Sequence, residues 1–199
     1  DMQNTNLYDA NFIQVDFTKI KNKSLAGSDL SEASFAYSNL SGVDLSGVTI
    51  VQTNFWKADL SGVDFTDIGY DTVEGTTFID AILPDSNFEG VDLSPKQQYS
   101  QVFENKAHLN NLHHNLIVKD LFGEFPHMFI ISMEVRGNDL AVNYVFFNTF
   151  AHANLENANF KNAVLWNVGF YSANLTNADL SGADLKNAFL DNADLSNAN

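Results

Sequence analysis

The chain has no cysteine and few basic residues. Without cysteine it can form neither a disulfide nor a thiolate metal site. Its ten lysines and arginines stand against 25 acidic residues, which gives a formal net charge of −15. Such acidity argues against direct binding to nucleic acid or to an anionic membrane. No hydrophobic run reaches the length of a transmembrane helix, so we expect no membrane insertion.

The sequence also lacks the motifs of common enzymes and cofactor sites. It contains no Ser-His-acid motif, phosphate-binding loop or glycine-rich nucleotide fingerprint. His108, His113 and His114 lie close together, but Asn111 and Leu112 occupy the positions from which a second helical ligand would join His108. We therefore expect a protein that is not an enzyme and that binds no cofactor and no metal.

A large apolar residue recurs at every fifth position, with a small residue two positions before it. On an α-helix five residues advance about 500°, so these side chains would form no stripe. On a straight strand an odd spacing would send alternate side chains to opposite faces. The pattern is satisfied if the backbone turns a corner within each repeat. The C-terminal series of central residues is Leu155, Phe160, Leu165, Phe170, Leu175, Leu180, Leu185, Leu190 and Leu195.

The other positions of the repeat favour such corners. Seven of the eleven glycines lie two residues after a central residue, and asparagine often takes this position in the C-terminal half. Both residue types tolerate left-handed backbone angles. An Asp or Asn directly before the central residue can bond neighbouring backbone amides from an outward position.

This A(D/N)LxN-type repeat resembles the pentapeptide-repeat family. The resemblance implies an all-β solenoid, a right-handed four-sided β-helix with four repeats to each coil. Residues 20 apart should then stack by type, as Phe35 and Phe55 do. Two excesses of three residues, near 19–23 and 70–78, should form bulges at corners. Known roles in the family range from scaffolding to inhibiting a topoisomerase by imitating DNA, so the resemblance leaves the task of this chain open.

One break in the repeat divides the chain into a first block over 1–93, an insertion over 94–129 and a second block over 130–199. Ser94 followed by Pro95 is a good helix start. Apolar residues downstream approximate helical spacing. We therefore predict a helical insertion, with one or two helices over 95–120, that lies against the solenoid.

The second block begins irregularly. Asn138, Asn143 and Asn148 occupy the small inward position in three successive repeats. A buried Asn must be hydrogen-bonded, so these residues either form ladders with backbone groups or mark distorted coils, and we favour distortion.

Outward aromatic residues are the sharpest surface feature. Phe146 and Trp166 follow central positions 20 residues apart, so they should stack on one outer face, with Phe147 and Tyr171 around the next corner. Large aromatics on a rigid rod are typical of a partner-binding surface. Alternatively, the helix over 95–120 covers them. Trp56 is expected to be an isolated outward indole.

Two functions remain. The first is a non-catalytic structural or protein-interaction scaffold with an unknown protein partner. The alternative is a DNA-mimicking modulator of a topoisomerase (gyrase), resembling the quinolone-resistance members of the family. Mimicry requires an acidic wall along the rod, and the sequence predicts one clear acidic ladder, Asp44 over Asp64. We therefore expect a scaffold.

The two ends of the sequence carry two further expectations. The chain stops at Asn199 in mid-pattern, so either it is truncated there or its open coil meets another molecule, as in an end-to-end homodimer. It begins with Asp1 and Met2, which indicates a processed or trimmed N-terminus. We expect export to a periplasm or lumen rather than retention in the cytoplasm.

Overall fold

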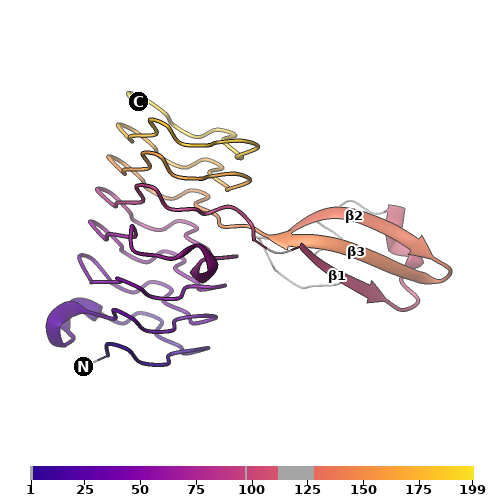
Figure 1. Ribbon diagram of the computed structural model, residues 1–199, viewed down its shortest axis with the longest axis horizontal. Coiled ribbons are helices and arrows are strands. Elements are labelled where there is room, and N and C mark those ends of the chain that lie inside the picture. Colours follow the sequence, from indigo (N-terminus) through magenta and orange to yellow (C-terminus); the bar gives the residue numbers. More distant parts are fainter. Residues whose placement is uncertain (1, 97, 112–127) are drawn as a thin grey trace.

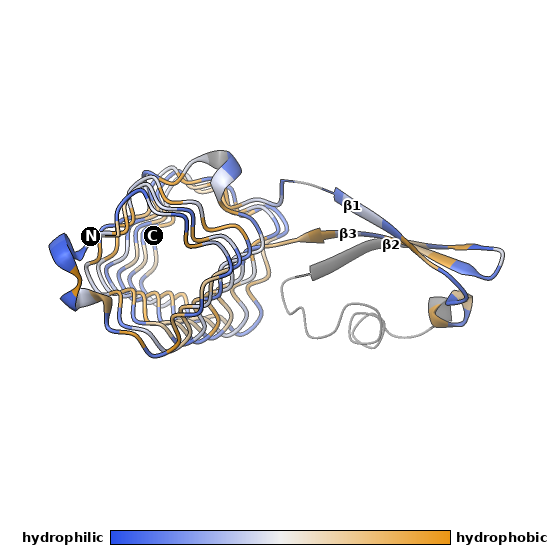
Figure 2. Cartoon of the chain, turned by 90° about the horizontal axis from the view of Figure 1, so that it is seen from below, coloured by the Kyte–Doolittle hydropathy of each residue, from blue (hydrophilic) through white to orange (hydrophobic). Residues whose placement is uncertain are grey.

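The computed structural model describes residues 2–96, 98–111 and 128–199. The two repeat blocks wind into one stack of coils, from which a small β-sheet projects to one side (Figure 1). Parallel bridges join neighbouring coils at residues 20 apart, such as Ser34 with Asn54 and Asn154 with Asn174. Figure 2 views the stack along its axis, and the outlines of successive coils superimpose. The predicted fold of the β-helix type is confirmed.

Each repeat turns through a short hydrogen-bonded loop. In one repeat the amide of Ala158 donates to the carbonyl of Leu155 at 3.0 Å, and Asn157 between them has φ of 58°. The outward Asp or Asn then bonds the amide two residues later, as Asp29 does with Ser31 at 3.0 Å. The five-residue period thus combines a left-handed residue with a side chain that fixes the turn.

The interior holds columns of stacked side chains. Phe35 and Phe55 stack with ring centroids 5.4 Å apart, as the 20-residue spacing predicts. The same column crosses the insertion, because Phe78 stacks on Phe150 at 4.6 Å. Rings of a second column meet the first edge to face, as Phe88 meets Phe150 at 5.5 Å. Both geometries are favourable for aromatic pairs.

The two predicted bulges are confirmed. Short 3₁₀ turns occur at η1 (Phe17–Lys19), η2 (Lys21–Lys23) and η3 (Tyr70–Thr72). The bridges that span these turns join residues 23 apart instead of 20, for example Asn54 with Thr77. The three extra residues therefore leave the stack in register.

The insertion is a β-sheet, so the predicted helical insertion is wrong over the residues that the structure describes. Strand β1 (Gln98–Phe103), the 3₁₀ turn η4 (Ala107–Asn111), β2 (Met128–Arg136) and β3 (Asp139–Phe146) follow one another. The strands pair antiparallel in the order β1-β3-β2. Residues 112–120 of the predicted helix lie outside the described residues.

The regular repeats resume at Asn148, and residues 130–146, predicted to open the second block, belong to β2, β3 and the turn between them. Bridges across the insertion, such as Asp92 with Val164, join residues 72 apart. Since an uninterrupted coil needs 20, the insertion adds 52 residues at one corner. Leu140, Val142 and Phe146 of β3 form a small core with Leu109, which gives the sheet its own buried face.

Candidate interaction surface

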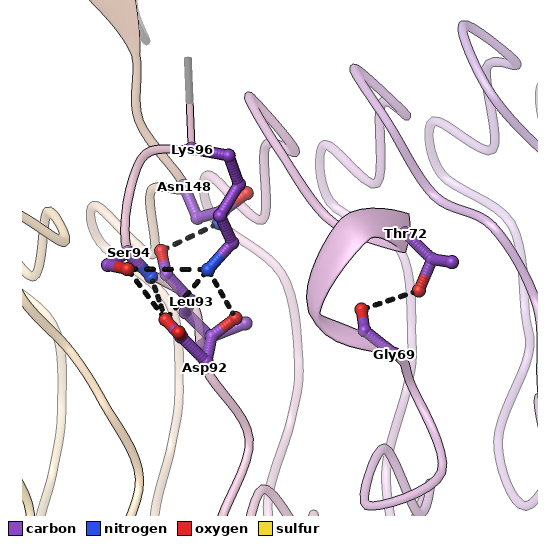
Figure 3. A network of polar contacts seen from close by, with 7 residues as sticks. All are labelled: Gly69, Thr72, Asp92, Leu93, Ser94, Lys96 and Asn148. Atoms are coloured by element: carbon purple, nitrogen blue, oxygen red, sulfur yellow. Dashed lines mark hydrogen bonds and ion pairs between the residues drawn. The ribbon is translucent and has the colours of Figure 1, made fainter.

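The root of the insertion is fixed by Asn148, which is fully buried. Its amide nitrogen donates to the carbonyl oxygen of Leu93 at 2.8 Å (Figure 3), and its amide oxygen accepts from the backbone N–H of Thr76 at 2.9 Å. At this position the hydrogen-bonded alternative is therefore right. Asn138 and Asn143 lie in the hairpin, so their predicted inward positions in coils are wrong.

A second contact at the root joins Lys96 to Asp92. The Lys96 ammonium lies 2.7 Å from the Asp92 carboxylate and 3.1 Å from the Asp92 carbonyl oxygen (Figure 3). Partial burial lowers the pKa of Lys96, although the nearby carboxylates oppose this. Burial also opposes ionisation of Asp92, but hydrogen bonds from Lys96 and Ser94 outweigh it and lower the pKa of the carboxyl. The pair holds the first residues of the insertion against the coil.

Phe146 does not lie on the outer face that the repeat predicts for it. It is the last residue of β3, is 9% exposed and contacts Tyr99 and Tyr144 with ring centroids 5.3 and 5.6 Å away. The predicted stacking of Phe146 on Trp166 is therefore wrong. The reason is that the repeats resume only at Asn148. Position 146 therefore still belongs to strand β3, and its side chain lies on the apolar face of the sheet rather than at an outer corner of a coil.

Phe147 carries the chain from β3 back to the rod. Its ring lies 5.9 Å from that of Phe189 and covers Gly169, where an added Cβ would come within 3.2 Å of the Phe147 ring. The usual outward Asp or Asn is replaced by glycine at this position, which leaves room for the ring. Phe147 is thus half-buried and anchors the insertion.

Trp166 and Tyr171 are exposed, as predicted, at the two corners that flank Gly169. The ammonium of Lys186 lies 5.6 Å from the Trp166 ring, a distance that allows a cation–π contact. Tyr171 meets the His152 ring edge to face at 5.4 Å. The insertion core covers neither side chain, since they are 39% and 46% exposed.

The structure places three further ring-bearing residues at the corner that holds Tyr171, one of which is His152. Tyr37 and Trp56 lie there as well, because backbone bonds link the same corner from coil to coil: Tyr37 with Trp56, Lys57 with Ile79, Asp80 with Ala151, and His152 with Tyr171. We name Tyr37, Trp56, His152 and Tyr171 the aromatic corner. Trp56, predicted to be isolated, contacts Tyr37 with ring centroids 5.0 Å apart.

Charged groups contact two members of the aromatic corner, Tyr37 and Trp56. The Lys57 ammonium lies 4.9 Å from the Trp56 ring and 5.7 Å from the Tyr37 ring. The Trp56 indole N–H donates to the Asp80 carboxylate at 3.0 Å. Tyr37 and Trp56 are nevertheless 45% and 38% exposed. Fixed, exposed aromatics with polar groups beside them have the character of a protein-binding surface.

The predicted acidic ladder of Asp44 and Asp64 does not continue along the rod. The outward position of Asp44 is taken by Ser24 in the preceding coil, and that of Asp64 by Asn87 in the following one. The carboxylate of Asp44 also accepts hydrogen bonds from Ser24 and Ser46. The ladder is therefore limited to Asp44 and Asp64, and the Asp44 carboxylate is already engaged in hydrogen bonds within the chain.

Other kinds of site were sought in the described part of the chain. There, no three His, Asp or Glu side chains are grouped closely enough to hold a metal ion. Within the same residues no helix has the length and apolar character that would let it cross a bilayer.

The family named Pentapeptide repeats matches this chain in eight copies, over residues 25–67, 149–182 and 173–199. No curated protein matches it in sequence. Among solved structures, HetL of the cyanobacterium Nostoc, a pentapeptide repeat protein involved in heterocyst differentiation regulation, is similar at 18% identity. That alignment covers 98% of this chain and 85% of HetL, with a TM-score of 0.34.

Two other solved structures are similar over most of the chain. A pentapeptide repeat protein of the Arabidopsis thaliana thylakoid lumen is 19% identical. The alignment covers 80% of this chain and 66% of the Arabidopsis chain, with a TM-score of 0.28. The plasmid-mediated fluoroquinolone resistance protein QnrB1 is 15% identical. The alignment covers 100% of this chain and 71% of the QnrB1 chain, with a TM-score of 0.41. The matched segments of this chain, residues 25–67 and 149–199, are therefore pentapeptide repeats, and bridged coils continue from them.

Proposed function

We propose that this protein is a non-catalytic interaction scaffold, a right-handed four-sided β-helix that presents aromatic side chains to a protein partner. The observation that supports this most is the aromatic corner, where Tyr37, Trp56 and Tyr171 are each more than a third exposed. A rigid rod loses little conformational entropy on binding, so side chains already held in place favour affinity.

Of the four residues predicted from sequence to bind a partner, Trp166 and Tyr171 fit this role. Phe146 and Phe147 serve it indirectly, because they join the sheet to the rod beside these two residues. Interface hot spots are enriched in Trp and Tyr, so truncating one such residue typically costs about 2 kcal/mol or more of binding free energy.

Capture of partners from an extract of the native organism tests the proposal. Trp56→Ala with Tyr171→Ala, and separately Trp166→Ala, should reduce recovery of the partner that the wild type retains. Tyr8→Ala is the matched control, because Tyr8 is an aromatic residue 53% exposed at a different corner. Equal recovery with all variants would refute the aromatic surface.

DNA mimicry remains the alternative. The net charge of −15 favours it, whereas the shortness of the Asp44–Asp64 ladder, which Ser24 and Asn87 end on either side, does not. A gyrase supercoiling assay separates the two functions. A scaffold should leave supercoiling unchanged, and inhibition by the wild type that Asp44→Asn with Asp64→Asn relieves would favour mimicry.

A further inference from the structure

The sheet of the insertion has two edges with different protection. Strand β3 lies between β1 and β2, so β1 and β2 each present one side of their backbone outward (Figure 1). An unpaired strand edge is a template for another strand unless charges, prolines or bulges block it. Whether an edge of this sheet can pair with another strand therefore depends on whether it carries a charge, a proline or a bulge.

Strand β2 carries such devices. Its register with β3 shifts between Ile130 and Ser132, which is the signature of a β-bulge. Glu134 and Arg136 are both exposed on this strand and form an ion pair of 2.9 Å. The turn η4 also packs against β2. This edge is therefore poorly suited to further pairing.

Strand β1 carries none of them. It runs Gln98, Tyr99, Ser100, Gln101, Val102, Phe103, without charge, proline or glycine, and pairs with β3 in an unbroken six-residue register. Val102 is 51% exposed, and Ser100 and Gln101 are exposed as well. Among the described residues β1 pairs with β3 alone. A regular, uncharged edge of this kind favours addition of a strand.

The strand that fits β1 best is β1 itself. In an antiparallel pair directly opposite residues share a face, so a two-fold axis through Gln101 sets Gln101 against its copy and Tyr99 against Phe103. The two aromatic residues belong to the apolar face of the sheet, where Tyr99 stacks on Tyr144 at 5.5 Å. Aromatic cross-strand pairs stabilise sheets, and this register opposes no like charges within β1.

Charge also favours a second copy at this place. The whole chain carries −15, so two copies repel each other over most of their surface. Residues 95–146 contain four basic and five acidic residues, a net charge of −1. Strand β1 runs outward from the rod (Figure 1), so antiparallel pairing sets the second rod beyond the far end of the sheet. The two acidic rods then lie at opposite ends of the shared sheet.

We propose that two copies of this chain associate through β1, forming a continuous six-stranded antiparallel sheet in the order β2-β3-β1-β1-β3-β2. The isologous contact closes on itself and ends at the two protected β2 edges. It is independent of the aromatic corner, which stays open on both rods.

Sedimentation velocity of the full chain across a wide concentration range tests this proposal. The wild type should show a reversible dimer. Gln101→Lys sets two like charges opposite each other at the axis and should weaken the dimer about fivefold or more, and Gln101→Glu should do the same. An equimolar mixture of the two variants should restore the dimer, which a folding defect would not allow.

Ser132→Lys is the matched control, because it places the same charge on an exposed position of β2. It should leave the dimer intact. A monomeric wild type would overturn the proposal. So would a dimer that is as stable in Gln101→Lys and in Gln101→Glu as in the wild type, and this second result would favour the end-to-end dimer instead.

Discussion

At the scale of single residues, Asn148 joins the insertion to the rod. Asn148→Ala leaves the amide of Thr76 and the carbonyl of Leu93 without their side-chain partner in a buried site. We expect this to lower the free energy of unfolding by roughly 2–4 kcal/mol. Urea unfolding measures it, with Asn143→Ala as control, since Asn143 bonds the exposed Ser132. Equal losses would show that Asn148 has no special role.

A second prediction for a single residue concerns the close packing around Gly169. An alanine Cβ there would lie 3.0 Å from the Thr149 hydroxyl and 3.2 Å from the Phe147 ring, so the ring must move. We expect Gly169→Ala to cost about 1–3 kcal/mol of unfolding free energy. Much of this loss should vanish in the background of Phe147→Leu, where the ring is absent. A double-mutant cycle tests the coupling, and additive losses would contradict the contact.

At the scale of the repeat element, three turns contain an Asp whose ionised form is favoured in the folded chain. Hydrogen bonds from Ser46 lower the pKa of Asp44 below its ordinary 3.8, and Ser181 and Ser196 do the same for Asp179 and Asp194. A carboxyl whose pKa is lower in the folded state contributes stability above the unfolded pKa and loses it as pH falls. We therefore expect the urea midpoint to fall as pH drops below about 4.

Asp44→Asn gives the matched test of this pH dependence. Asparagine keeps the oxygen that accepts from the backbone but does not titrate, and Asn39 and Asn174 already make the same turn contact. The variant should therefore lose less stability than the wild type between pH 5 and pH 3. Identical acid profiles would show that Asp44 does not contribute to the acid sensitivity.

The insertion shows why an element can be misread from sequence. Ser94 and Pro95 are a helix start by local preference, but Ser94 instead donates to Asp92 in a turn, and β1 gains a six-residue ladder with β3. Long-range pairing outweighs local preference in strands. Asn138 and Asn143 happen to keep the five-residue phase, which concealed a hairpin whose turn signal, Gly137 followed by Asn138, was present.

At the scale of the whole molecule, the five-residue period predicted a corner in each repeat and the residues of the core, and the resemblance to the family supplied the coil of four repeats. The aromatic corner could not be found in this way. Between Trp56 and Tyr171, a bulge of three residues and an insertion of 52 shift the numbering away from a multiple of 20. Tyr37 and Trp56 are 19 apart because they occupy neighbouring positions in two stacked repeats, two residues after Phe35 and one after Phe55. Once the bridges between coils are known, following one corner from coil to coil shows that these residues share it.

The last prediction follows from the continuity of the stack. Deleting residues 96–147 joins Pro95 to Asn148, which restores a five-residue step from Leu93 to Phe150. Since Phe78 already stacks on Phe150 and Asp85 accepts from Asn157 across the insertion, the shortened rod should fold and unfold cooperatively.

Circular dichroism and urea unfolding measure the fold of the shortened rod, and sedimentation its association. The shortened rod should be monomeric while keeping partner capture at the aromatic corner, because β1 is removed and Tyr37, Trp56 and Tyr171 are not. An unfolded product would show that the sheet stabilises the rod. A shortened rod that folds and still forms the wild-type dimer would place self-association on the coils rather than on β1.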